Sequence, residues 1–196
     1  MSLPDLVSPL VGEPVALAFS LLLVFHVFAG LTCVVTGAVA IASPKGRGRH
    51  PRLGDVYYWS LSVVFASATG LAGIRWTHDA HLFVLGALAF AVASIGYGAR
   101  RIRWRGWTSV HILGMSASYV VLLTAFYVDN GPHLPFLNQL PVLVLWAGPS
   151  LIGLPLVAGA LIRHANLLAD IRATARALAG LIAPGPTQGT RGPRTA

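Results

Sequence analysis

The sequence predicts an all-α fold: a polytopic transmembrane helical bundle of about five spans, with its N-terminus outside and its C-terminus in the cytoplasm. Hydrophobic residues make up 55% of the 196 positions and charged residues only 10%, against about a quarter charged in soluble domains. The apolar residues gather in long runs, and the basic residues gather between alternate runs. These three observations together favour a protein that crosses a membrane several times.

Five apolar runs account for the predicted spans. Each is close to the roughly 20 residues that cross about 30 Å of hydrocarbon. The runs are apolar on every face, whereas barrel strands alternate apolar and polar residues, so we expect helices. They cover residues 15–42, 56–74, 82–99, 107–128 and 140–162.

The segments outside the bundle of residues 15–163 have different compositions. Residues 1–14 contain acids but no Lys or Arg, which is unlike a cleavable signal peptide, and they are predicted to form an external segment. Residues 164–183 have one apolar stripe, which predicts an amphipathic helix lying along the inner membrane surface. Residues 184–196 are poor in apolar side chains and are predicted to be disordered.

The basic residues predict the orientation. With five spans, all of the Lys and Arg residues except Arg75 lie on one side, which is the positive-inside pattern of a protein in the cytoplasmic membrane. Clusters of this kind bind anionic lipid, so the net charge of +8 does not predict a nucleic-acid partner. The predicted partners are the lipid bilayer and a membrane protein or a second copy. The clustered cations are Lys45, Arg47, Arg49, Arg52, Arg100, Arg101, Arg103, Arg105, Arg163, Arg172, Arg176, Arg191 and Arg194.

Two histidines are expected inside the membrane. His26 shares a narrow face of the first span with Gly30, Cys33 and Gly37, and a face of small residues should point into the bundle. At about 1.5 Å per residue, His26 lies near the midplane and His111 about 6 Å above the inner boundary, about 10 Å apart in height. Cys33 is the only cysteine, which excludes an intramolecular disulfide and a thiolate metal cluster.

His26 and His111 are candidate ligands of haem b or of a transition metal, because haem, copper and proton relays all use neutral imidazole. Their separation in height is too large for one small ion unless the helices tilt. Proton transfer is a second interpretation. The third is a hydrogen bond from His26 to Tyr, Thr or Ser on a neighbouring helix, which would serve packing alone.

Further candidates lie at the membrane boundaries. At the cytoplasmic start of the second span, His50 and Arg52 are candidate cofactor-binding residues, suited to a phosphate, a lipid head group or a haem propionate. The alternative there is a helix start with aromatic anchors. On the external side, His78 and His81 are three residues apart and form with His133 a candidate zinc or copper site, the alternative being a hydrated loop.

The stretch HPRLGDVYYW, with one histidine in the span before it and another in a later span, resembles a family of bacterial multi-pass membrane proteins of unknown function. That family combines a first-helix His, an H-x-R-x-G-x-x-Y motif and a later helix His. The resemblance implies a compact inner-membrane helical bundle and no particular activity. The bundle also resembles, more loosely, b-type cytochromes and haem-handling assembly proteins. The matching residues are His26, His50, Arg52, Gly54, Tyr57 and His111.

Three functions follow as hypotheses. The leading one is haem or metal binding through buried histidines, for electron transfer or cofactor handling. The second is a small-solute transporter or channel, because Pro149 and Pro155 interrupt the fifth run as in broken transporter helices. The third is a non-catalytic accessory subunit. The sequence contains no GxSxG, HExxH, P-loop or dinucleotide fingerprint, so no enzyme reaction is predicted.

Overall fold

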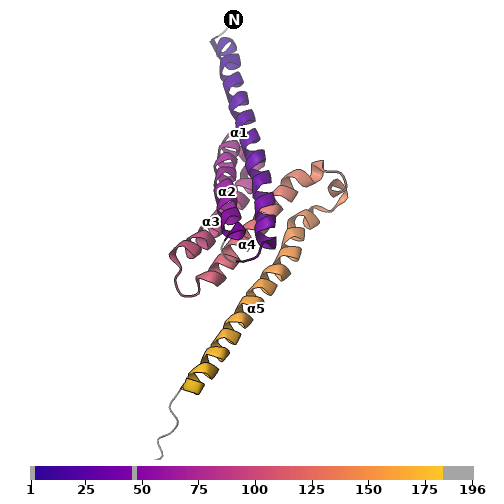
Figure 1. The fold of residues 1–196 in the computed structure, drawn as a ribbon. Helices are drawn as coiled ribbons and strands as arrows, with labels where there is room; N and C mark the ends of the chain where they lie inside the picture. Colours follow the sequence, from indigo (N-terminus) through magenta and orange to yellow (C-terminus); the bar gives the residue numbers. More distant parts are fainter. Residues whose placement is uncertain (1–2, 46–47, 183–196) are drawn as a thin grey trace, which may run out of the picture. The chain divides into compact units, whose positions relative to one another are not determined.

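The protein is described by a computed structural model over residues 3–45 and 48–182, and within these ranges it is helical almost throughout. The predicted all-α fold is confirmed (Figure 1). Two 3₁₀ turns, η1 (Gly131–His133) and η2 (Leu137–Gln139), interrupt the connection between the last two helices. The described α-helices are α1 (Leu3–Ala42), α2 (Arg49–Ile74), α3 (Trp76–Ile102), α4 (Trp107–Asn130) and α5 (Val142–Ile182).

The chain divides into two compact units, Met1–Ala158 and Gly159–Ala196. The first unit contains α1 to α4 and the beginning of α5. In this unit α1 packs on α2, α2 on α3, and α3 on α4, so helices that follow one another in sequence are neighbours. Because the connections between these helices are short, the neighbours run antiparallel, and α2 lies between α1 and α3 (Figure 1).

Four segments of the described chain are long and apolar enough to cross a membrane: Pro14–Ala42, Asp79–Ile102, Trp107–His133 and Val142–Asn166. They correspond to the first, third, fourth and fifth predicted spans. The second predicted span lies in α2, which is not among these segments. Hydropathy therefore supports a membrane protein with four candidate spans among the described residues, one fewer than the five predicted.

The ends of the bundle differ in detail from the predicted segments. Helix α1 begins at Leu3 and runs through the segment expected to precede the first span. Helix α5 continues from Val142 to Ile182 with Pro149 and Pro155 inside it, so the predicted span and residues 164–182 of the predicted surface helix are both helical. The predicted tail of residues 184–196 lies outside the described residues.

The exposed side chains of α1 are those of a helix in contact with lipid. Phe25 and Phe28 are 63% and 69% exposed, while the small Cys33 is fully buried. Water would make such an arrangement unfavourable, but lipid tails are as apolar as the side chains themselves. On the narrow inward face predicted for His26, Gly30, Cys33 and Gly37, the residues Cys33 and Gly37 are buried, whereas a Cβ at Gly30 would meet no heavy atom within 4 Å.

Helices α2 and α3 are held together by stacked aromatic rings. The rings of Tyr58 and Tyr97 are 4.1 Å apart between centres and nearly parallel. Phe65 and Phe90 stack at 5.2 Å further along the same interface. Aromatic pairs of this kind contribute about 0.5–1.5 kcal/mol beyond their buried area, so they hold α2 firmly against its neighbour.

Helices α3 and α4 approach each other backbone to backbone. A Cβ atom at Gly114 would lie 2.6 Å from the Val92 carbonyl oxygen and 2.7 Å from Gly96 Cα. Only glycine permits this approach, as in other membrane helix pairs with small residues at their contact. The crossing fixes the position of His111, which lies about one turn before Gly114 on α4.

Candidate functional site

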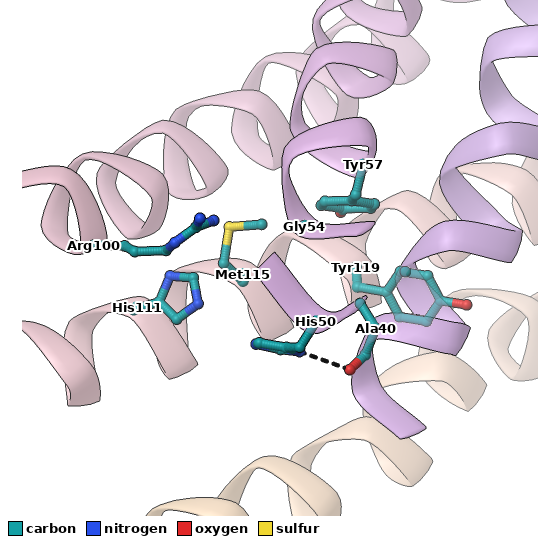
Figure 2. Close-up of a pocket in the computed structure, with 9 residues that line it drawn as sticks. Ala40, His50, Gly54, Tyr57, Arg100, His111, Met115 and Tyr119 are labelled. Carbon is teal, nitrogen blue, oxygen red and sulfur yellow. Dashed lines mark hydrogen bonds between the residues drawn. The ribbon is translucent and has the colours of Figure 1, made fainter. Parts of the chain in front are cut away.

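A cavity of about 50 Å³ lies at the end of the first unit where α1 and α3 end and α2 and α4 begin. The connections that carry the two basic clusters of the sequence leave the helices at this same end. Figure 2 shows the lining side chains arranged around one space. They are Gly37 and Ala40 of α1, His50, Gly54 and Tyr57 of α2, Arg100 of α3, and His111, Met115 and Tyr119 of α4.

Two imidazoles face this cavity, and both are anchored in the same way. The Nδ1 atom of His50 lies 2.8 Å from the Ala40 carbonyl oxygen, and the Nδ1 atom of His111 lies 3.0 Å from the Gly96 carbonyl oxygen. Because a carbonyl can only accept, each Nδ1 carries the hydrogen and donates it. In the neutral ring the Nε2 atom then keeps its lone pair. The two ring centres are 6.4 Å apart and the rings are perpendicular.

The surroundings of His50 favour its neutral form. His50 precedes the apolar part of α2, and partial burial lowers the pKa of its imidazole. The hydrogen bond to Ala40 opposes this effect, and the nearby cations Lys45 and Arg100 lower the pKa further. At neutral pH the ring therefore offers a lone pair rather than a positive charge.

Arg100 is the cation that lines the cavity. Its guanidinium donates to the Asp55 carboxylate at 3.0 Å and to the Pro51 carbonyl at 3.5 Å. The ion pair joins α3 to the first turns of α2 and offsets part of the charge of Arg100. Arg52, the residue that the sequence pattern associates with His50, is exposed and is not part of the lining.

Tyr57 and Tyr119 both line the cavity. The Tyr57 hydroxyl lies 2.9 Å from Ser118 Oγ, and the Tyr119 hydroxyl donates to the Val34 carbonyl at 3.0 Å. A Cβ at Gly37 would collide with the Tyr119 ring, so the glycine makes room for it. Neither Ser118 nor Val34 lines the cavity. The two tyrosine hydroxyl groups are therefore hydrogen-bonded to partners outside the cavity lining.

His26 has a different environment. Its Nδ1 lies 3.0 Å from Ser67 Oγ on α2, and the Ser67 hydroxyl donates to the Val63 carbonyl at 2.7 Å, so Ser67 accepts from the imidazole. Ser67 follows His50 by 17 positions on α2, which is roughly 25 Å along the helix. The structure thus pairs His111 with His50 and not with His26. The contact of His26 agrees with the packing alternative.

The external histidines are not gathered around one point. His81 on α3 is exposed, with its ring centre 6.4 Å from that of Trp146 on α5, and His133 is exposed in η1. Over the described residues, no three His, Cys, Asp or Glu side chains form a group able to hold a metal ion. The side chain of His78 lies outside the described residues, so the proposed external site stays a prediction.

Sequence reasoning did not assign Met115 or Arg100 to a site. Met115 follows His111 by four positions, so both lie on one face of α4, and this spacing is visible in the sequence. Arg100 was interpreted only through its effect on orientation, and its place beside Asp55 depends on how α2 and α3 pack. Comparison with known protein families, with curated proteins and with solved structures finds no match to this chain.

Proposed function

We propose that this chain is a multi-pass protein of the cytoplasmic membrane that binds a transition-metal ion between His50 and His111, at the cytoplasmic end of a five-span bundle. The observation that carries the proposal is the shared anchoring of the two imidazoles. Both donate Nδ1–H to a backbone carbonyl and both line one cavity.

The five-span topology rests on the packing of α2. This helix is in contact with α1 and α3, each of which contains a segment able to cross the membrane, and one residue, Arg75, separates it from α3. A helix that lies antiparallel between two spans must cross with them. Both basic clusters are then at the cytoplasmic end, together with the cavity.

The geometry of the two rings suits one shared ion. Metal-binding histidines usually donate their other ring N–H to a carboxylate or a backbone carbonyl, which fixes the tautomer and aims the lone pair. A metal–imidazole bond is about 2.0–2.1 Å. Because each ring nitrogen lies about 1.15 Å from its ring centre, one ion with two collinear bonds holds the ring centres about 6.4 Å apart at most. The separation of 6.4 Å between His50 and His111 is at this limit.

A haem does not fit the same site. The cavity of about 50 Å³ has room for an ion and its water, whereas pockets that enclose organic ligands have roughly 300–1,000 Å³. Handling of a metal ion is therefore favoured over haem-based electron transfer.

An anion is also a poorer occupant than a metal ion. An anion would need protonated rings, but burial keeps the pKa of His50 low. The guanidinium of Arg100 is already bonded to Asp55 and to the Pro51 carbonyl. Two neutral imidazoles with available lone pairs are acceptor groups, and acceptors bind cations.

The test is metal binding by the purified protein in detergent. After equilibration with copper or zinc and removal of excess metal, we expect about one equivalent per chain in the wild type and much less in His50→Gln and His111→Gln. His164→Gln, a half-buried histidine of α5 that does not line the cavity and belongs to none of the candidate sites, is the matched control and should bind as the wild type does. Protection of the buried Cys33 thiol checks that each variant is folded. Equal metal content in all four proteins, or no bound metal in the wild type, would contradict the proposal.

A further inference from the structure

A thioether side chain, that of Met115, also lines the cavity. His111 and Met115 are on one face of α4, and both line the cavity that His50 approaches from α2 (Figure 2). Apart from Met1, Met115 is the only methionine of the chain. Methionine is flexible and its sulfur is polarisable, so small changes of its torsions bring the sulfur to a nearby ion.

We infer that the ion is copper(I), held by the imidazoles of His50 and His111 and by the thioether of Met115. This inference rests on the proposed function, because it names the ion that the same cavity takes.

The donor set selects this ion. Thioether and imidazole groups together suit copper(I), while carboxylates and water suit harder cations. Zinc sites use four protein ligands, or three and a water, drawn from Cys, His and carboxylates. Over the described residues no three such side chains come together, and the nearby carboxylate of Asp55 is bonded to Arg100. Copper(I) is satisfied by two or three soft ligands, which is what the cavity supplies.

The charge around the cavity favours a monovalent ion. Arg100 lines the cavity, and the Lys45 ammonium donates to the carbonyl of Ala40, the same carbonyl that accepts from His50. Coulomb repulsion is proportional to the charge of the bound ion, so copper(I) meets half the repulsion that a divalent ion would meet at the same point. Neutral ligands also add no charge that would attract a divalent ion.

The experiment measures copper(I) affinity under reducing conditions, by competition with a chromophoric copper(I) chelator, and zinc affinity with a zinc indicator. Met115→Leu keeps the size and apolar character of the side chain but removes the sulfur. We expect it to weaken copper(I) binding by at least the roughly 10- to 100-fold that loss of a supporting partner costs a metal site. Zinc binding should be weaker than copper(I) binding in the wild type and unchanged in the variant.

X-ray absorption of the copper(I) complex gives a second readout. The wild type should show a copper–sulfur distance that disappears in Met115→Leu. Cys33→Ser is the control, since Cys33 is buried and does not line the cavity. This variant should retain the copper–sulfur signal.

The outcomes separate the inference from the proposed function. Zinc bound through His50 and His111 as tightly as copper(I), with no effect of Met115→Leu, would overturn the choice of copper(I) and leave the metal site standing. A copper–sulfur signal that is lost in Cys33→Ser would also overturn it. No bound metal, or full binding in His50→Gln and His111→Gln, would remove both.

Discussion

Replacing Gly114 with alanine should separate α3 from α4 at the point where their backbones touch. The new Cβ would lie 2.6–2.8 Å from the Val92 carbonyl oxygen and from the N and Cα atoms of Gly96. Ordinary contacts between heavy atoms need about 3.5–4.0 Å. Because all of these neighbours are backbone atoms, no rotation of a side chain can relieve the collision, and the helices must move apart by about 1 Å.

Two losses determine the size of the effect. Overpacking of a close contact costs about 1–3 kcal/mol. The same movement breaks the hydrogen bond from His111 to the Gly96 carbonyl, and polar bonds between membrane helices contribute about 0.6 kcal/mol on average and about 1.7 at most. We therefore expect Gly114→Ala to reduce the free energy of unfolding by about 2–4 kcal/mol.

The assay uses the single cysteine. Cys33 is fully buried in the core of the first unit, so a thiol-reactive dye labels it only when the bundle opens. The temperature of labelling should fall by about 4–16 °C in Gly114→Ala, at about 2–4 °C per kcal/mol for a chain of this length. The variant should also bind metal less well, because His111 moves with α4.

Gly98→Ala on α3 is the matched control. A Cβ there would meet no heavy atom within 4 Å, and alanine is a better helix former than glycine by up to about 1 kcal/mol. Its labelling temperature should equal or exceed that of the wild type. If Gly114→Ala and Gly98→Ala open at the same temperature, the close approach of α3 and α4 is not what holds this end of the bundle.

The other predictions concern the polar contacts and the topology. His26→Leu should lower stability by about 0.6–1.7 kcal/mol without changing metal content, and adding Ser67→Ala should cost little more because their bond is already lost; loss of metal in His26→Leu would contradict this. Asp55→Asn should weaken copper(I) binding by leaving the charge of Arg100 uncompensated, and adding Arg100→Gln should restore it; equal affinity in wild type and Asp55→Asn would show that the ion pair does not act on the site. Tags at the two chain ends should be accessible from opposite sides of the membrane, and accessibility of both from one side would exclude an odd number of spans.

The helices and some of their ends follow from the sequence because lipid leaves few alternatives. The fourth apolar run was predicted from residue 107, and α4 begins at Trp107. Gly106 precedes it with a φ of 84°, a conformation that glycine adopts without strain, and so ends the connection there. The apolar runs and the glycines that punctuate them are local features, which a single sequence displays.

The site follows from the sequence only in part, because it depends on how helices cross. Straight, untilted helices place His26 and His111 about 10 Å apart in height. They do not predict which side chains of other helices contact these two histidines. The pairing of His111 with His50 arises from the crossing of α3 and α4 at Gly96 and Gly114 and from the packing of α2 on α1. No periodicity encodes such crossings, so His50 and His111 were each identified as candidates but not as partners.

The low apolar content of α2 and the presence of candidate site residues on it have the same physical cause. Lipid selects apolar side chains only where a helix faces it. The sides of α2 that pack against its neighbours can therefore carry polar residues such as His50, Asp55, Tyr57 and Ser67. The apolar character of α2 is the lowest among the five described α-helices. In a bundle of this size, ligands and polar contacts should therefore be sought on a helix that packs against two neighbours and is less apolar than both. Metal binding by the His50 variant tests this reasoning directly.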